Sequence, residues 1–191
     1  MMEGIIHEDK TFEKIVYSGK EARGREFEHC TFKLCDFSDS DFSQSRFTDC
    51  TFIGCNLSMV KLSDATLDNV VFKECKLLGV NFGVCNDFLF TVRFEGSVLD
   101  YASFLKKKMA KTQFTDTSLK RVDFTKATLT NSVFGNTDLA GAVFEGTELA
   151  GADLSSAFNF EIDPELNNIR KAKFSNYGLQ GLLTKYNLQV V

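Results

Sequence analysis

Large apolar side chains recur every five residues along this chain, and that spacing limits the folds it can adopt. The stretch FEHCTFKLCDFSDSDFSQSRF at 27–47 places Phe at each fifth position. A helix face repeats every ~3.6 residues and a strand face every second residue, so neither element alone explains the spacing. All but four of the 20 phenylalanines keep this register, and the exceptions are Phe88, Phe90, Phe158 and Phe160.

Small side chains form a second series, two positions before each large one. Examples are Cys30, Cys35, Ser40, Ala102 and Thr112. The other three positions of each five are mostly polar, with Gly recurring two after the large residue. The pattern predicts a short extended segment with two inward side chains, then a tight corner of the kind that glycine favours. Repetition winds the chain into a solenoid, and the alternation of Phe and Leu over 114–149 indicates an even number of sides per coil.

The run TDLAGAVFEGTELAGADLSS at 137–156 resembles the pentapeptide repeat, A(D/N)LXX, and the resemblance covers about residues 12–157 and 169–176. It implies an all-β fold, a right-handed quadrilateral β-helix. Such a solenoid has about 20 residues per coil, and its coils stack at the ~4.8 Å spacing of neighbouring strands.

The register divides the chain into four segments: an N-terminal cap at 1–11, the solenoid at 12–157, an irregular connection at 158–168, and a last partial coil with a short C-terminal α-helix at 169–191. Within the solenoid, a register break at 83–93 adds two residues, and the pattern resumes at Leu89. The connection holds the single proline, Pro164, which disfavours continued regular structure.

Composition indicates a globular, cytoplasmic protein. The net charge of −4 argues against nucleic acid as a direct ligand. No stretch reaches the ~20 apolar residues of a membrane span. The first residues lack the basic start and apolar run of a signal peptide, so we expect no membrane partner.

The cysteines and histidines do not predict catalysis, a metal or a cofactor. All six cysteines fall on the small-residue positions, where Cys35, Cys55 and Cys75 would stack in one column as packed, reduced thiols. Such a line cannot supply four tetrahedral zinc ligands. His29 is at an outward position and His7 precedes the repeats, so neither is expected beside a nucleophile.

The C-terminal sequence NYGLQGLLTKYNLQVV combines helical spacing with an apolar end that includes Val190 and Val191. A helix here would cap the open end of the solenoid, which otherwise exposes core side chains. The excess of apolar residues further predicts a homodimer. The predicted interface residues are Leu179, Leu182, Leu183, Tyr186 and Leu188.

Charge is unevenly spread in the second half. Basic residues dominate from Lys106 to Lys126, and their role is left open. No Lys or Arg occurs from 127 to 169, and the carboxylates there either form a solvated face or make an acidic strip that binds a partner. The strip residues are Asp138, Glu145, Glu148, Asp153, Glu161, Asp163 and Glu165.

The C-terminal tail is similar to that of the Qnr-type quinolone-resistance pentapeptide proteins. This resemblance implies a rod-like dimer that imitates DNA and binds DNA gyrase or topoisomerase IV, because surface carboxylates can substitute for phosphates. The other hypothesis is a non-catalytic scaffold or binding module for a different protein. A continuous negative strip along the dimer favours DNA mimicry, and a broken one favours the scaffold.

Overall fold

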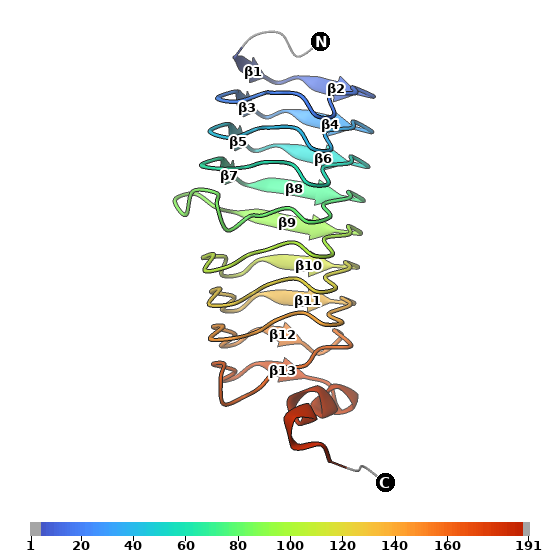
Figure 1. Cartoon of the computed structure of the whole chain (residues 1–191), viewed down its shortest axis with the longest axis vertical. Helices are drawn as coiled ribbons and strands as arrows, with labels where there is room; N and C mark the ends of the chain where they lie inside the picture. Colours follow the sequence, from blue (N-terminus) through green and yellow to red (C-terminus); the bar gives the residue numbers. More distant parts are fainter. Residues whose placement is uncertain (1–4, 189–191) are drawn as a thin grey trace.

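The computed structural model describes residues 5–188 of the 191-residue chain. The chain winds into a rod of about eight stacked coils (Figure 1), and the right-handed quadrilateral β-helix predicted from the sequence is confirmed. Val190 and Val191, part of the expected apolar end, lie outside the described residues.

Short strands form two parallel sheets, ordered β1-β3-β5-β7 and β13-β12-β11-β10-β9-β8-β6-β4-β2. Their bounds are β1 Ile6–Glu8, β2 Thr11–Glu13, β3 Glu26–Glu28, β4 Thr31–Lys33, β5 Arg46–Thr48, β6 Thr51–Ile53, β7 Thr66–Asp68, β8 Val70–Lys73, β9 Val92–Glu95, β10 Gln113–Thr115, β11 Val133–Gly135, β12 Asp153–Leu154 and β13 Lys173–Phe174. Two 3-10 helices follow, η1 Asn176–Leu182 and η2 Thr184–Tyr186.

Each coil has four sides. Two sides carry the sheets, and the other two are joined by isolated parallel bridges such as Val16 to Asp36 and Glu21 to Asp41. Bridged residues lie 20 positions apart, so four five-residue units complete one coil. Consecutive units therefore face different sides of the rod, a geometry that decides where every surface charge lies.

The two inward series of the sequence fill the interior. Phenylalanine rings of the nine-stranded side stack from Phe12 to Phe134, with centroids 4.5 Å apart for Phe32 and Phe52 and 5.4 Å apart for Phe94 and Phe114. Such aromatic contacts add to the stabilisation from burial alone.

The corners use left-handed backbone conformations. The residue two after the large one has a positive φ when it is glycine, as at Gly54 (61°), and also when it is not, as at Leu34 (52°) and Tyr101 (63°). Glycine adopts this region without steric cost, whereas other residues pay about 1–2 kcal/mol. The need for this corner explains why Gly recurs at that position.

The first coil begins earlier than the sequence indicated. Residues 1–11 were expected to form a cap, but β1 pairs with β3 and places His7 opposite Phe27. His7 therefore occupies an inward position five residues before Phe12, and it is buried. Its imidazole in place of an apolar side chain concealed the extra repeat.

Around 83–93 the offset between paired residues grows to 22, as between Val70 and Val92. The added residues form an outward loop near β7 and β9 (Figure 1). The sequence register resumed at Leu89, but Phe90 fills the core instead, and Leu89 is exposed with a positive φ of 59°. Phe88, at 80% exposure, points into solvent.

The C-terminal segment is helical but not α-helical. It forms η1 and η2, and Ser175 caps η1 by accepting a hydrogen bond from the Gly178 N–H. Two glycines explain the tight winding. A Cβ at Gly178 would lie 2.9 Å from the Phe160 ring, and one at Gly181 would overlap the Phe160 carbonyl oxygen. The chain therefore winds closely over Phe160, which lies in the 158–168 connection.

Candidate interaction surface

The core enclosed by residues 42–77 is filled by side chains and has no room for a ligand. An apolar space of only about 10 Å³, lined in part by Phe52, Leu57 and Leu62, is at the lower limit for one water molecule. Among residues 5–188, no group of three or more His, Cys, Asp or Glu side chains is arranged to hold a metal ion. The same residues include no helix long and apolar enough to cross a membrane.

The two histidines have opposite environments. The His7 ring stacks on Phe27 at 4.9 Å and meets Phe12 edge-on at 5.4 Å. His29 is exposed at a corner, between Asp9 at 3.9 Å and Asp49 at 3.5 Å. His7 lies among packing groups and His29 among surface carboxylates.

All six cysteines are buried and free. Cys35 and Cys55 stack as expected, with the Cys35 N–H donating to the Cys55 sulfur at 3.4 Å. Burial raises the pKa of Cys50 and of Cys85 to about 12, which keeps these thiols protonated. Neutral, buried thiols act here as small packing groups.

The residues of the predicted acidic strip do not line up. Asp138 bridges to Phe158, Glu148 to Asn168, and Asp153 pairs with Lys173 in the nine-stranded sheet. These three carboxylates thus lie on three different sides of the rod. The three are separated because residues 5 or 10 positions apart belong to different sides, whereas a spacing of 20, or of 22 across the inserted loop, keeps residues on one side.

Neighbouring coils also neutralise several of these carboxylates. Lys120 lies 3.2 Å from Asp138, and Lys173 lies 3.3 Å from Asp153. The absence of Lys and Arg from 127–169 suggested unpaired acid, but the partners come from the coils before and after. Sequence distance therefore concealed contacts that stacking makes short.

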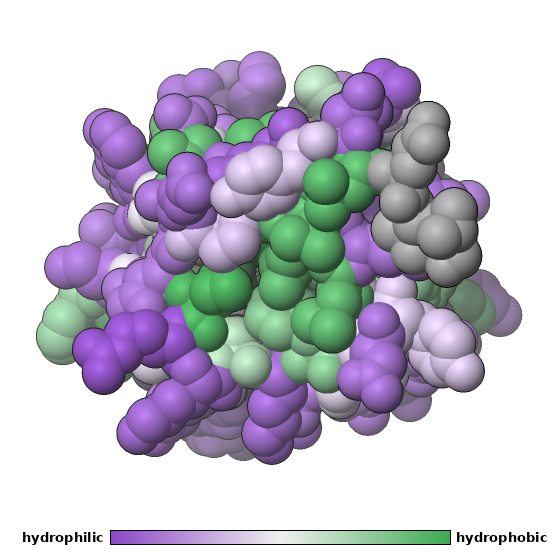
Figure 2. Space-filling view, turned by 90° about the horizontal axis from the view of Figure 1, so that it is seen from below, coloured by the Kyte–Doolittle hydropathy of each residue, from purple (hydrophilic) through white to green (hydrophobic). Residues whose placement is uncertain are grey.

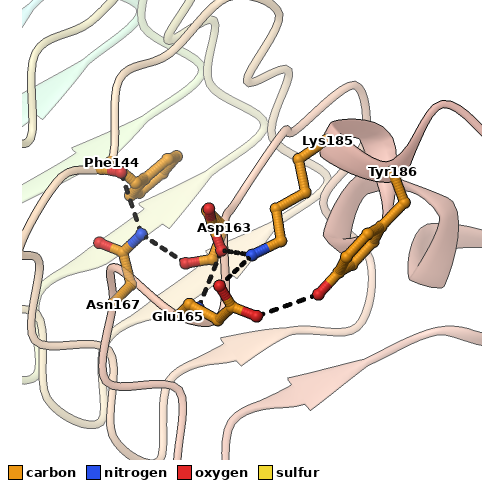
Figure 3. A network of polar contacts seen from close by, with 6 residues as sticks. All are labelled: Phe144, Asp163, Glu165, Asn167, Lys185 and Tyr186. Atoms are coloured by element: carbon orange, nitrogen blue, oxygen red, sulfur yellow. Dashed lines mark hydrogen bonds and ion pairs between the residues drawn. The ribbon is translucent and has the colours of Figure 1, made fainter.

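Asp163 and Glu165, assigned to the strip, instead hold the C-terminal segment. Lys185 of η2 lies 2.7 Å from Asp163 and 2.8 Å from Glu165, and the Tyr186 hydroxyl donates to Glu165 at 3.1 Å (Figure 3). The hydrogen bond from Lys185 is the main cause that lowers the pKa of both carboxyls. Asn167 fixes the same connection by donating to the carbonyl oxygens of Phe144 and Asp163.

The predicted dimer residues lie at the end of the rod, and four of the five are exposed. Leu179, Leu183, Tyr186 and Leu188 are 41–58% exposed, whereas Leu182 packs against the solenoid core and caps it. The sequence missed Tyr177, which is 94% exposed.

Seen from this end, apolar atoms form a continuous area framed by polar ones (Figure 2). A hollow of about 570 Å³ opens beside it, between η1 and the turn at 158–161. The end of the rod therefore combines exposed apolar side chains with a hollow, the features expected of a contact surface.

Lys107 is the other residue whose environment the sequence analysis missed. It was counted in the basic surface run, yet its side chain is fully buried. Its ammonium donates to the Cys85 carbonyl at 2.6 Å and to Asp87 at 2.9 Å, over the Phe90 ring at 4.8 Å. Lys107 stands five residues after Ala102, at a position of the small, inward-facing series. That position in the repeat was the sequence signal for its burial.

Comparison with known proteins follows this geometry. A profile described as "Pentapeptide repeat region" matches residues 25–104, and one described as "Pentapeptide repeats (8 copies)" matches 108–136 and 129–158. The chain belongs to the pentapeptide repeat family. No curated protein sequence matches this pentapeptide repeat chain.

Solved pentapeptide repeat structures share its architecture. Trypsin-treated QnrB1, a plasmid-mediated fluoroquinolone resistance protein, is similar at 18% identity and a TM-score of 0.64, covering 97% of this chain and 100% of that chain. Full-length QnrB1 gives 19% identity and 0.55, covering 96% and 100%. HetL, a pentapeptide repeat protein from the cyanobacterium Nostoc involved in heterocyst differentiation regulation, gives 15% and 0.49, covering 88% and 86%. At these identities the likeness to QnrB1 shows the fold.

Proposed function

We propose that this chain is a non-catalytic, protein-binding solenoid that pairs through its C-terminal end and presents its outer sides to a protein partner. The observation that carries the proposal is the exposed apolar area at the end of the rod (Figure 2). Contiguous apolar surface of this kind marks interaction sites in soluble proteins. The proposal places the protein in the cytoplasm, where six buried cysteines stay reduced.

The pairing is expected to be two-fold, the commonest symmetry of homo-oligomers. Leu179, Leu183 and Leu188 are each about half exposed, so burying what remains stabilises the pair by roughly 1 kcal/mol per side chain. Tyr177 has more surface to bury and a hydroxyl to keep hydrated at the rim. Leu182 already packs on the core and contributes to the cap instead.

The test compares two substitutions at equal exposure. Leu183 at the end of the rod and Leu105 on the side are both 41% exposed. At high salt, where contacts between exposed charges are screened, Leu183→Asp should convert a dimer to a monomer in sedimentation velocity, whereas Leu105→Asp should leave it intact. Both variants should keep the β-rich circular dichroism of the parent. A dimer that survives Leu183→Asp at high salt, or a parent that is monomeric there, contradicts pairing through this end.

A second candidate function is binding to DNA gyrase or topoisomerase IV by DNA mimicry. The observation behind it is the likeness in fold to QnrB1 over nearly the whole length of both chains. The expected acidic strip is broken, since Asp138, Glu148 and Asp153 lie on three sides, and this favours the scaffold. Inhibition of gyrase supercoiling by the purified protein would support mimicry, and no inhibition at low salt would leave the scaffold.

A further inference from the structure

One side of the rod carries charges of opposite sign on its two halves. We call it the bipolar side. In its N-terminal half it is the outer face of the β1-β3-β5-β7 sheet and its adjoining corners. The acidic residues there are Glu8, Asp9, Glu26, Glu28, Asp49 and Asp68; basic side chains also occur, at Arg46 in β5 and at Lys10 and Arg25 beside the corners.

The same side continues beyond the loop at 86–91. Each of β1, β3 and β5 directly precedes a strand of the nine-stranded sheet, and residues 108–111 precede β10 in the same way. Parallel bridges then join Lys108 to Thr128, Thr128 to Glu148 and Glu148 to Asn168. The outward charges on this half are Lys108, Lys111, Arg170 and Lys171, opposed by Glu148.

Most charges of the bipolar side have no ion-pair partner in the described part of the chain; the exceptions are Asp9 and Asp49, which lie 3.9 and 3.5 Å from His29. None of Lys108, Lys111, Arg170 and Lys171 forms an ion pair in the described part of the chain, and neither do Glu8, Glu26, Glu28 and Asp68. Elsewhere on the rod, coils pair their charges, as Lys73 and Glu95 do at 3.0 Å. The side therefore keeps a mostly unpaired acidic half and a mostly unpaired basic half.

An apolar projection separates the two halves. Phe88 is 80% exposed and Leu89 is 40% exposed on the loop, which Lys107 anchors from inside through Cys85 and Asp87. An apolar centre flanked by charged surface has the layout of a protein interface, with its polar rim around a hydrophobic core.

We propose that the bipolar side pairs two copies of this chain antiparallel, about a two-fold axis close to Phe88. Rotation by a half-turn brings most of the acidic half of one copy onto the basic half of the other, and Phe88 meets its counterpart; the exceptions are Glu26 and Glu28, which then face Glu148. Asp68 then faces Lys108 and Lys111 of the second copy. A parallel arrangement would set like charges against each other, which disfavours association.

At the far ends of the same pairing, Glu8 and Asp9 face Arg170 and Lys171 of the second copy. These four residues are exposed, so their reversal should spare the fold. The surface is separate from the C-terminal end, so this association does not depend on the tail. Electrostatic contacts across exposed sides weaken with salt, whereas apolar pairing at the rod end does not weaken in this way.

The experiment uses the full-length chain carrying Leu183→Asp, so that only the bipolar side can pair. Sedimentation at low and high salt should show a dimer that dissociates as salt rises. Glu8→Lys with Asp9→Lys should weaken it roughly tenfold or more, as should Arg170→Glu with Lys171→Glu. An equimolar mixture of the two reversed proteins should restore a dimer of mixed composition. Phe88→Ser should weaken association at every salt concentration.

A matched control reverses two acidic residues on another side, Glu13→Lys with Glu74→Lys, and should leave pairing unchanged. A Leu183→Asp chain that stays monomeric at low salt overturns the proposal, even if it captures a foreign basic protein. So does a mixture of reversed proteins that fails to associate. Pairing of the wild type through its tail is tested separately, by the comparison of Leu183→Asp with Leu105→Asp.

Discussion

Asp87→Ala should destabilise the protein because it leaves the buried ammonium group of Lys107 without its carboxylate partner. Lys107 has no exposed side-chain surface, and Asp87, at 2.9 Å, is its carboxylate partner. Breaking a buried ion pair from one side costs about 3–5 kcal/mol. Because the Asp87 side chain is 57% exposed, solvent screens part of the interaction, and we expect a loss of about 1–3 kcal/mol in the free energy of unfolding.

Lys107→Met separates this charge effect from other causes. The variant removes the buried ammonium and leaves the Cys85 carbonyl without its donor, a loss of about 1–3 kcal/mol that apolar packing partly offsets. In this background Asp87 has no buried charge to balance. Adding Asp87→Ala should then change the free energy of unfolding by less than about 0.5 kcal/mol, as is usual for an exposed surface substitution.

Urea denaturation followed by far-UV circular dichroism measures the four proteins of this cycle. Glu145→Ala, at an exposed carboxylate without an ion pair, is the control and should be near neutral. Labelling of the buried Cys85 gives a local reading, and it should be faster in Asp87→Ala because the loop loosens. Equal effects of Asp87→Ala in the wild-type and Lys107→Met backgrounds would refute the reasoning.

Three further outcomes are expected. Phe94→Ala removes a ring stacked between two others and should cost about 3–5 kcal/mol in urea unfolding, whereas Phe88→Ala should be near neutral; similar losses at both would contradict the core assignment. The six thiols should resist labelling until denaturant is added, and prompt reaction in the native protein would show that they are not buried. The contacts with Lys185 lower the pKa values of Asp163 and Glu165, so these contacts stabilise the C-terminal segment above the unfolded pKa of ~4. The stabilisation is lost as pH falls through the folded pKa values. Protection of the η2 amides against hydrogen exchange, relative to the intrinsic exchange rate at each pH, should therefore fall in acid, and Lys185→Met should abolish that dependence.

The five-residue period was enough to determine the solenoid. Each large residue points inward, and the residue two positions later forms a corner. The corner requires a positive φ, which Gly adopts readily. Because these rules act within a few residues, the Phe ladder, the buried cysteines and the break near 83–93 could be anticipated from the sequence. Two local details did not follow from the period. These are the imidazole of His7 at an inward position and the burial of Phe90 in place of Leu89.

What only the tertiary structure decided is which residues meet across coils. The acidic strip failed because neighbours in sequence face different sides, while Lys120 and Asp138 meet across a gap of 18 residues. The burial of Lys107 required the inserted loop to close over it, and the close approach of Gly181 to Phe160 set the tight winding of the tail. Stacking converts a spacing of about one coil into direct contact, and its outcome depends on insertions and side-chain length that a repeat pattern does not encode.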